Sequence, residues 1–132
     1  LEIVGPQFGG GDHAKSADLA KAMMQANPDM AGFFAGNEGS AIGTLLAVDE
    51  LDMAGEIVVI GYDSGKAQID AIKDGSMAGA VQQNPVGIGA WCVEAAAMAL
   101  QGEEVPDPID TGYLWADASN IDSEEVMAVL YE

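Results

Sequence analysis

Short apolar runs rich in β-branched residues alternate with helix-like segments along this 132-residue sequence, and this alternation constrains the fold more than any other feature. The clearest run is EIVVIG at residues 56–61, whose unbroken apolar character is typical of a strand covered on both faces. The predicted strands are one that begins at Ile3-Val4 and four at residues 30–35, 56–61, 77–82 and 111–115.

The segments between these runs carry helix start and stop signals. The predicted helices are 13–26, capped by Asp12 and stopped by Asn27-Pro28; about 38–52, capped by Asn37; about 65–74, capped by Ser64 and ended by Gly75; one between Pro85 and Gly102; and a short C-terminal helix opened by Asp122 and Ser123. Strands joined by single helices require right-handed crossovers. The sequence therefore predicts an α/β doubly wound domain, with a mostly parallel sheet and helices on both faces.

The helix after Pro85 has the clearest amphipathic pattern. Its apolar stripe, at the i, i+3, i+4, i+7 spacing of one helix face, consists of Ile88, Trp91, Cys92, Ala95, Ala96, Ala99 and Leu100. We expect this stripe to be packed, and Cys92 to be a buried structural thiol, because free cysteine commonly packs as a small apolar residue. With one cysteine, the chain cannot form an internal disulfide.

The charge balance is strongly acidic. Twenty-two acidic residues face four lysines and no arginine, for a formal net charge of -18. Nucleic-acid binding draws its affinity from lysine and arginine, so the composition argues against a nucleic-acid partner. Two interpretations of the acidity remain open: a surface adapted to high salt, which screens the self-repulsion of the acids, or an ordinary acidic secreted protein.

Polar residues follow three of the predicted strands. Asn37, Asp63 and Gln83 each come at or just after a strand end, and ligands of open parallel sheets bind beyond the carboxyl ends of the strands. Carboxylates accept hydrogen bonds, and amides both accept and donate them, which suits a neutral polyhydroxylated ligand. Each residue also has a purely structural interpretation: Asn37 as a helix cap, Asp63 as a turn residue and Gln83 as a strand-end residue.

Catalytic and metal-binding patterns are weak. The sequence has no GxSxG motif, and any triad would have to use its one histidine, His13, which we expect to be exposed at a helix start. Asp107, Asp110 and Asp117 do not follow the spacing of a calcium-binding loop. We therefore predict a protein that is not an enzyme, with no cofactor and no metal.

Three blocks of sequence resemble the type I periplasmic sugar-binding proteins of ABC importers, in the ribose-binding group. They are QANPDMAGFFAGNEGSAIG at 25–43, IVVIGYDSGKAQIDAIKDGSMAGAVQQNP at 57–85 and VEAAAMALQGEEVP at 93–106. The resemblance implies that Asn37, Asp63 and Gln83 bind sugar hydroxyls. The family usually has an aromatic residue where this chain has Gly11, and Phe8 could replace it in stacking on the sugar.

The family has two lobes, and the resemblance implies that this single α/β domain, 1–132, is the C-terminal portion of such a protein. Residues 1–83 would form the C-terminal lobe, residues 84–108 a helix that packs on the missing N-terminal lobe, and residues 109–132 a return strand and a C-terminal helix. Without that lobe, the apolar stripe would have to pack on its own sheet or on a second copy. The implied partners are a sugar or polyol and an ABC permease in the membrane, and the implied location is periplasmic or extracytoplasmic, with any signal peptide outside this chain.

Two other functions share this type of fold. The first is the effector-binding domain of a LacI-type transcription regulator, which requires a helix-turn-helix ahead of this segment. The second is a small flavodoxin-like or receiver-like domain. Receiver chemistry needs paired acids after the first strand and a lysine late in the fold, and here the first run ends in Gln7-Phe8 with no lysine beyond Lys73. The oligomeric state stays open.

Overall fold

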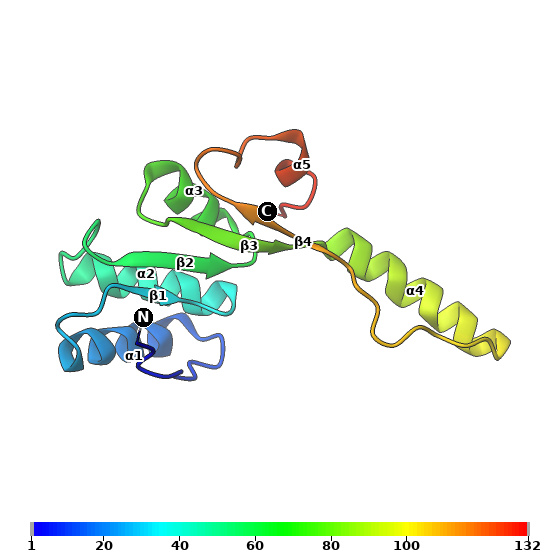
Figure 1. Ribbon diagram of the computed structural model, residues 1–132, viewed down its shortest axis with the longest axis horizontal. Coiled ribbons are helices and arrows are strands. Elements are labelled where there is room, and N and C mark those ends of the chain that lie inside the picture. The colour runs from blue at the N-terminus through cyan, green and yellow to red at the C-terminus, as the bar shows by residue number, and fades with distance from the viewer. Residues whose placement is uncertain (1, 132) are drawn as a thin grey trace.

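A four-stranded sheet with the order β1-β2-β3-β4 organises the molecule (Figure 1). The computed structural model describes residues 2–131. Its elements are α1 (His13–Ala26), β1 (Gly32–Phe34), α2 (Glu38–Glu50), β2 (Val58–Tyr62), α3 (Lys66–Asp74), β3 (Gly79–Gln83), α4 (Pro85–Gln101), β4 (Tyr113–Ala116) and α5 (Glu124–Met127). β1, β2 and β3 are parallel, and β4 runs antiparallel to β3. This mostly parallel sheet with helical connections confirms the predicted fold class.

Most predicted helix ends are confirmed by their caps. Asp12 accepts a hydrogen bond from the backbone N of Lys15 at 2.8 Å, and α1 ends at Asn27 as expected. Gly75 and Gly102 adopt the left-handed conformation that ends α3 and α4. Ser123 caps α5 through its side chain.

Two local predictions were wrong. Ile3-Val4 does not begin a strand: residues 2–9 have no regular structure, and no strand of the described chain pairs with them. A strand needs a neighbour for its backbone groups, and β1 pairs only with β2. Ser64 does not cap α3, because the N-cap is Gly65, with no side-chain hydrogen bond, and Ser64 is buried one residue earlier.

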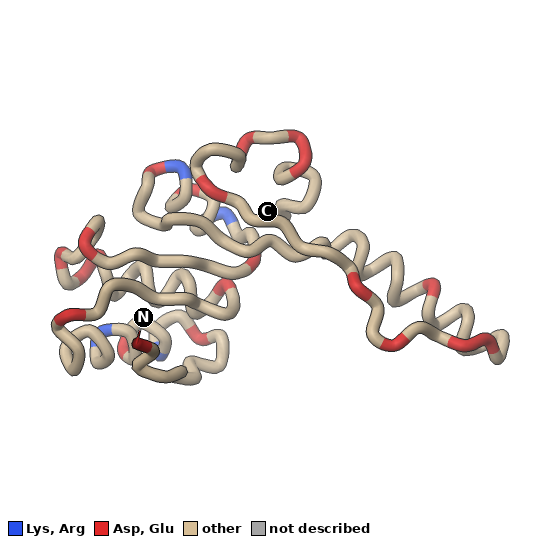
Figure 2. Tube along the Cα trace, viewed as in Figure 1, with Lys and Arg blue, Asp and Glu red and all other residues tan. Residues whose placement is uncertain are grey.

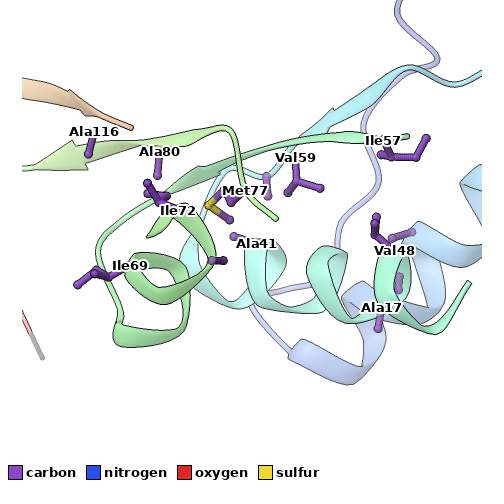
Figure 3. Close-up of a cluster of buried hydrophobic side chains, with 14 of the residues drawn as sticks. Ala17, Ala41, Val48, Ile57, Val59, Ile69, Ile72, Met77, Ala80 and Ala116 are labelled. Carbon is purple, nitrogen blue, oxygen red and sulfur yellow. The ribbon is translucent and has the colours of Figure 1, made fainter. Parts of the chain in front are cut away.

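The hydrophobic core lies between the sheet and the helices α2 and α3 (Figure 3). Val59 and Ala80 point from the strands toward Ile72 of α3 and toward Met77, and all four are buried. On the opposite face of the sheet, Phe34 and Val58 are mostly exposed. Within residues 2–131, the helices therefore cover one of the two faces where helices were expected.

Helix α1 packs against α2 rather than against the sheet. A Cβ on Gly43 of α2 would lie 2.5 Å from the carbonyl oxygen of His13 and 2.6 Å from the Cβ of Ser16, so glycine permits this close approach. An ion pair between Lys21 of α1 and Glu50 of α2 joins the two helices. This packing fixes α2 against α1, and α2 begins directly after the loop that follows β1.

Helix α4 projects away from the rest of the molecule, and the segment 103–112 returns beside it (Figure 1). None of its residues is buried, and Leu100 is 90% exposed. The apolar stripe therefore does not pack on the chain's own sheet. Cys92 is exposed, so the prediction of a buried thiol was wrong: within residues 2–131, no residue of α4 is buried.

Candidate ligand-binding site

The carboxyl ends of β2 and β3 bring two of the predicted site residues into direct contact. Nε2 of Gln83 donates to Oδ1 of Asp63 at 2.6 Å. The backbone N of Asp63 donates to the carbonyl oxygen of Val81 at 2.9 Å, which extends the parallel ladder to this point. The expected convergence of strand ends therefore brings Asp63 and Gln83 together.

The carboxylate of Asp63 also binds the loop after β1. Its Oδ2 accepts from the backbone N of Glu38 at 3.3 Å, so each oxygen has one donor from the protein. Carboxylate oxygens have further lone pairs, and Asp63 is only half-buried, so hydroxyl donors can still reach it. Asp63 holds φ at 75°, a left-handed conformation that non-glycine residues rarely adopt. Strain of this kind gathers at functional sites.

Asn37 lies next to this pair and caps α2. Its Oδ1 accepts from the backbone N of Ser40 at 2.9 Å, as the structural interpretation of this residue predicts. The cap fixes the side chain at the start of the helix, and the next residue, Glu38, contacts Asp63 through its backbone. Asn37 thus lies at the site edge, and its role toward a ligand stays a prediction.

Phe8 belongs to the irregular segment before α1, and the residue is 80% exposed. Its side chain is therefore accessible to a ligand. Stacking of Phe8 on a sugar stays a prediction.

The C-terminal segment contributes contacts that the sequence did not reveal. The phenol of Tyr131 donates to Oε2 of Glu38 at 3.3 Å, and its backbone N donates to Oγ of Ser64 at 3.4 Å. Burial raises the pKa of Tyr131 above its ordinary value, and the negative charges of Asp63 and Glu38 add to this rise. Tyr131 and Glu38 are 93 positions apart, and no local pattern signals such a contact.

The described side chains do not form a metal-binding cluster. Groups of three or more His, Cys, Asp or Glu side chains that could hold a metal ion are not found in residues 2–131. His13 is exposed at the start of α1, as predicted. Figure 2 shows acidic residues spread over all parts of the chain, with the few lysines on α1 and α3. None of the helices within 2–131 is long and apolar enough to cross a membrane.

Curated relatives include sugar-binding proteins of bacterial importers. The chain is 33% identical over 109 residues to the ribose import binding protein of Bacillus subtilis, a match that covers 83% of this chain and 35% of that protein. It is 35% identical over 94 residues to the ribose import binding protein of Salmonella typhimurium, covering 71% of this chain and 31% of that protein. The chain therefore spans about a third of the length of these relatives.

Solved structures extend the likeness to nearly the whole chain. An ABC transporter solute-binding protein from Agrobacterium vitis with bound D-fucose matches with a TM-score of 0.91 and 34% identity, over 99% of this chain and 45% of that one. A second protein from the same species, bound to α-D-tagatopyranose, matches with a TM-score of 0.92 and 30% identity, over 99% of this chain and 44% of that one.

A family model gives the most direct assignment. The model described as a periplasmic binding protein domain matches residues 1–104, and this range contains Asn37, Asp63 and Gln83. The three blocks of sequence that resembled this family also lie within or across that range. The chain belongs to the periplasmic binding protein domain family.

Proposed function

We propose that this chain is part of the substrate-binding component of an ABC transporter, which binds a sugar or sugar alcohol non-covalently and delivers it to a membrane permease. The observation that supports this most is the contact between Asp63 and Gln83 at the carboxyl ends of β2 and β3. It places a carboxylate and an amide together at the edge where ligands of parallel sheets bind.

The chemistry of this edge suits a neutral ligand with several hydroxyls. The carboxylate of Asp63 accepts hydrogen bonds from hydroxyls, and the amides of Asn37 and Gln83 provide both donors and acceptors. A net charge of -18, with four lysines in the whole chain, disfavours an anionic ligand. Phe8, which is exposed, would add an aromatic surface for the sugar ring.

The named relatives favour transport over the two rival functions. They are ribose import binding proteins and ABC transporter solute-binding proteins with bound sugars, which are binding proteins and not enzymes. A transcription regulator of the LacI type shares the fold, but relatives that are sugar-binding transport proteins fit that function less well. The match to a periplasmic binding protein domain also supports an extracytoplasmic location for the protein that contains this chain.

The helix α4 supports the proposal of a second lobe. Helix α4 leaves the sheet without a buried residue, although its stripe of Ile88, Trp91 and Leu100 is apolar. An amphipathic helix gains its stability in a protein from packing of its apolar face. We infer that α4 packs on an N-terminal lobe formed by the rest of a longer chain, with residues 1–83 and 109–132 in the C-terminal lobe.

A thermal-shift screen on the full-length protein tests the function. D-ribose, D-allose, D-fucose, D-tagatose, D-arabinose and the corresponding sugar alcohols would be added at millimolar concentration. A ligand that binds only the folded state raises the melting temperature, by an amount that grows with its concentration over Kd. We expect at least one of these compounds to do so.

Two variants make the screen specific. Asp63→Ala should abolish most of the shift, because a hydrogen bond to a charged group is worth about 1.5–3 kcal/mol, or at least tenfold in affinity. Asp70→Ala is the matched control, since Asp70 is an exposed acid paired with Lys66 on α3. Absence of any shift with the unmodified protein, across the whole panel, would contradict the proposed function.

A further inference from the structure

A pocket of about 200 Å³ opens where β3 ends and β4 begins. Its lining includes Gln82, Gln83 and Asn84 on one side and Thr111, Leu114 and Val129 on the other. The volume is several times the ~30 Å³ that one water molecule occupies in the liquid. We call this space the Gln82 pocket.

The side chain of Gln82 is the unusual feature of this pocket. Gln82 is 1% exposed, and neither Oε1 nor Nε2 has a hydrogen-bond partner within residues 2–131. In the neighbouring Gln83, by contrast, the amide nitrogen donates a hydrogen bond to Asp63. Buried polar groups of folded proteins are almost always paired, because desolvation without a partner is costly. The Gln82 amide can therefore pair with a group that the described chain does not supply.

The chemistry of the lining defines that group. A side-chain amide donates from Nε2 and accepts at Oε1, and one hydroxyl can satisfy both, by accepting from the first and donating to the second. The other named lining residues are neutral: two amides, a hydroxyl and two aliphatic side chains. A charged ligand would find no opposite charge there, so a neutral hydroxylated group fits best.

The position of Gln82 connects the pocket with the candidate site. The backbone N of Asp63 bonds to the carbonyl of Val81, so Asp63 lies beside Gln82 at the end of the parallel ladder. On the basis of the proposed function, we propose that the Gln82 pocket is a ligand subsite that holds a hydroxyl-bearing end of the sugar or polyol, with the Gln82 amide bound to one hydroxyl.

The test is calorimetry on the full-length protein with the panel sugar that binds it best, among D-ribose, D-allose, D-fucose, D-tagatose and D-arabinose. Gln82→Met keeps the length of the side chain and removes the amide. We expect at least a tenfold loss of affinity. Analogues of the same sugar that each lack one hydroxyl then identify the hydroxyl that Gln82 binds. The analogue without that hydroxyl should bind the unmodified protein at least tenfold more weakly than the parent sugar does. The Gln82→Met variant should bind this analogue and the parent sugar with equal affinity.

A second variant covers the case in which Gln82→Met fails to fold. Val129→Phe fills the pocket from the other side and removes no amide, and Val129 is half-buried, so the protein should tolerate it. We expect the affinity of this variant for the sugar also to fall tenfold or more. Ser16→Ala is the control: it removes a buried, unpartnered hydroxyl on α1, away from the pocket, and should leave the affinity unchanged.

The outcomes separate this inference from the function on which it rests. If the unmodified protein binds none of the sugars, the proposed function fails, and the subsite fails with it. If the unmodified protein binds a sugar, and both Gln82→Met and Val129→Phe bind it within twofold of that affinity, the function stands and the subsite is wrong. The Gln82 amide would then be paired with water or with another part of the longer chain.

Discussion

Gln83 donates from Nε2 to Oδ1 of Asp63 across 2.6 Å, which joins the ends of two neighbouring strands through their side chains. The two residues lie 20 positions apart in the sequence. The contact holds the carboxylate from one side while the backbone of Glu38 holds it from the other. The two side chains thus act as one unit.

Because they act as one unit, replacing both should cost less than the sum of the single replacements. We expect Asp63→Ala and Gln83→Ala each to weaken sugar binding, and the double variant to fall short of additivity by at least 0.5 kcal/mol. Calorimetry on the four proteins measures this coupling. Strict additivity would mean that the two side chains contribute to binding independently.

The backbone of Asp63 allows its conformation and its charge to be separated. With φ at 75°, glycine should be more stable at this position than alanine, by about 1–2 kcal/mol, because the Cβ is disfavoured in left-handed backbone. We expect Asp63→Gly to unfold at a higher denaturant concentration than Asp63→Ala, and both variants to lose affinity alike. Equal stability of the two variants would show that this conformation carries no strain.

Asn37 has two roles that one pair of variants can separate. Asn37→Ala removes the cap on the backbone N of Ser40 and should cost about 1 kcal/mol of stability. Asn37→Ser keeps a capping oxygen and should restore most of that stability, while it lacks the amide that we expect to bind the ligand. Chemical denaturation measures the stability of each variant, and calorimetry measures its affinity for the ligand. Full affinity in Asn37→Ser would leave Asn37 with the structural role alone.

Asp117 should give a titration signal through the indole of Trp115. Hydrogen bonds from the side chain and backbone of Ser119, and then from Trp115, lower the pKa of Asp117 below its ordinary value of 3.8. Because the folded carboxyl has the lower pKa, its stabilising effect is complete above pH 3.8 and is lost as the pH falls through the folded value.

Fluorescence of Trp115, measured with Trp91 and any tryptophan outside these 132 residues replaced by phenylalanine, should therefore change with a midpoint below pH 3.8. Asp117→Asn is the control, since it retains a side chain of the same size without the titrating carboxyl. The same fluorescence change in Asp117→Asn would assign the signal to another acid or to unfolding.

Salt should stabilise this protein. The structure shows ion pairs at Lys21–Glu50, Lys66–Asp70 and Lys73–Asp122, yet the net charge is -18, so repulsion among the acids dominates. At 1 M salt the screening length falls to about 3 Å, which removes most of that repulsion between exposed acids. We expect the melting temperature to rise as the KCl concentration is raised from about 0.05 to about 1 M, because the repulsion between the acids is progressively screened over this range. A flat or falling melting temperature would exclude salt adaptation of the surface.

Local signals in the sequence determined most of the fold. Asp12 and Asn37 as caps, Gly75 and Gly102 as helix ends, and the apolar run at 56–61 depend on interactions within a few residues of the chain, which is why they could be predicted. The rule that ligands lie beyond strand ends also pointed to Asp63 and Gln83.

Only the tertiary structure decided the rest, because those features depend on partners that are distant in sequence. Ile3-Val4 has the pattern of a strand but no neighbouring strand, and Cys92 lies in an apolar stripe that nothing in the described chain covers. The phenol of Tyr131 meets Glu38 only because the C-terminal segment returns to the end of β2, where the backbone N of Tyr131 donates to Ser64. The unpartnered amide of Gln82 likewise depends on what surrounds it in space. The spacing of apolar residues along the sequence shows which side of a helix or strand a residue lies on. Which residue it contacts depends on the packing of the whole chain.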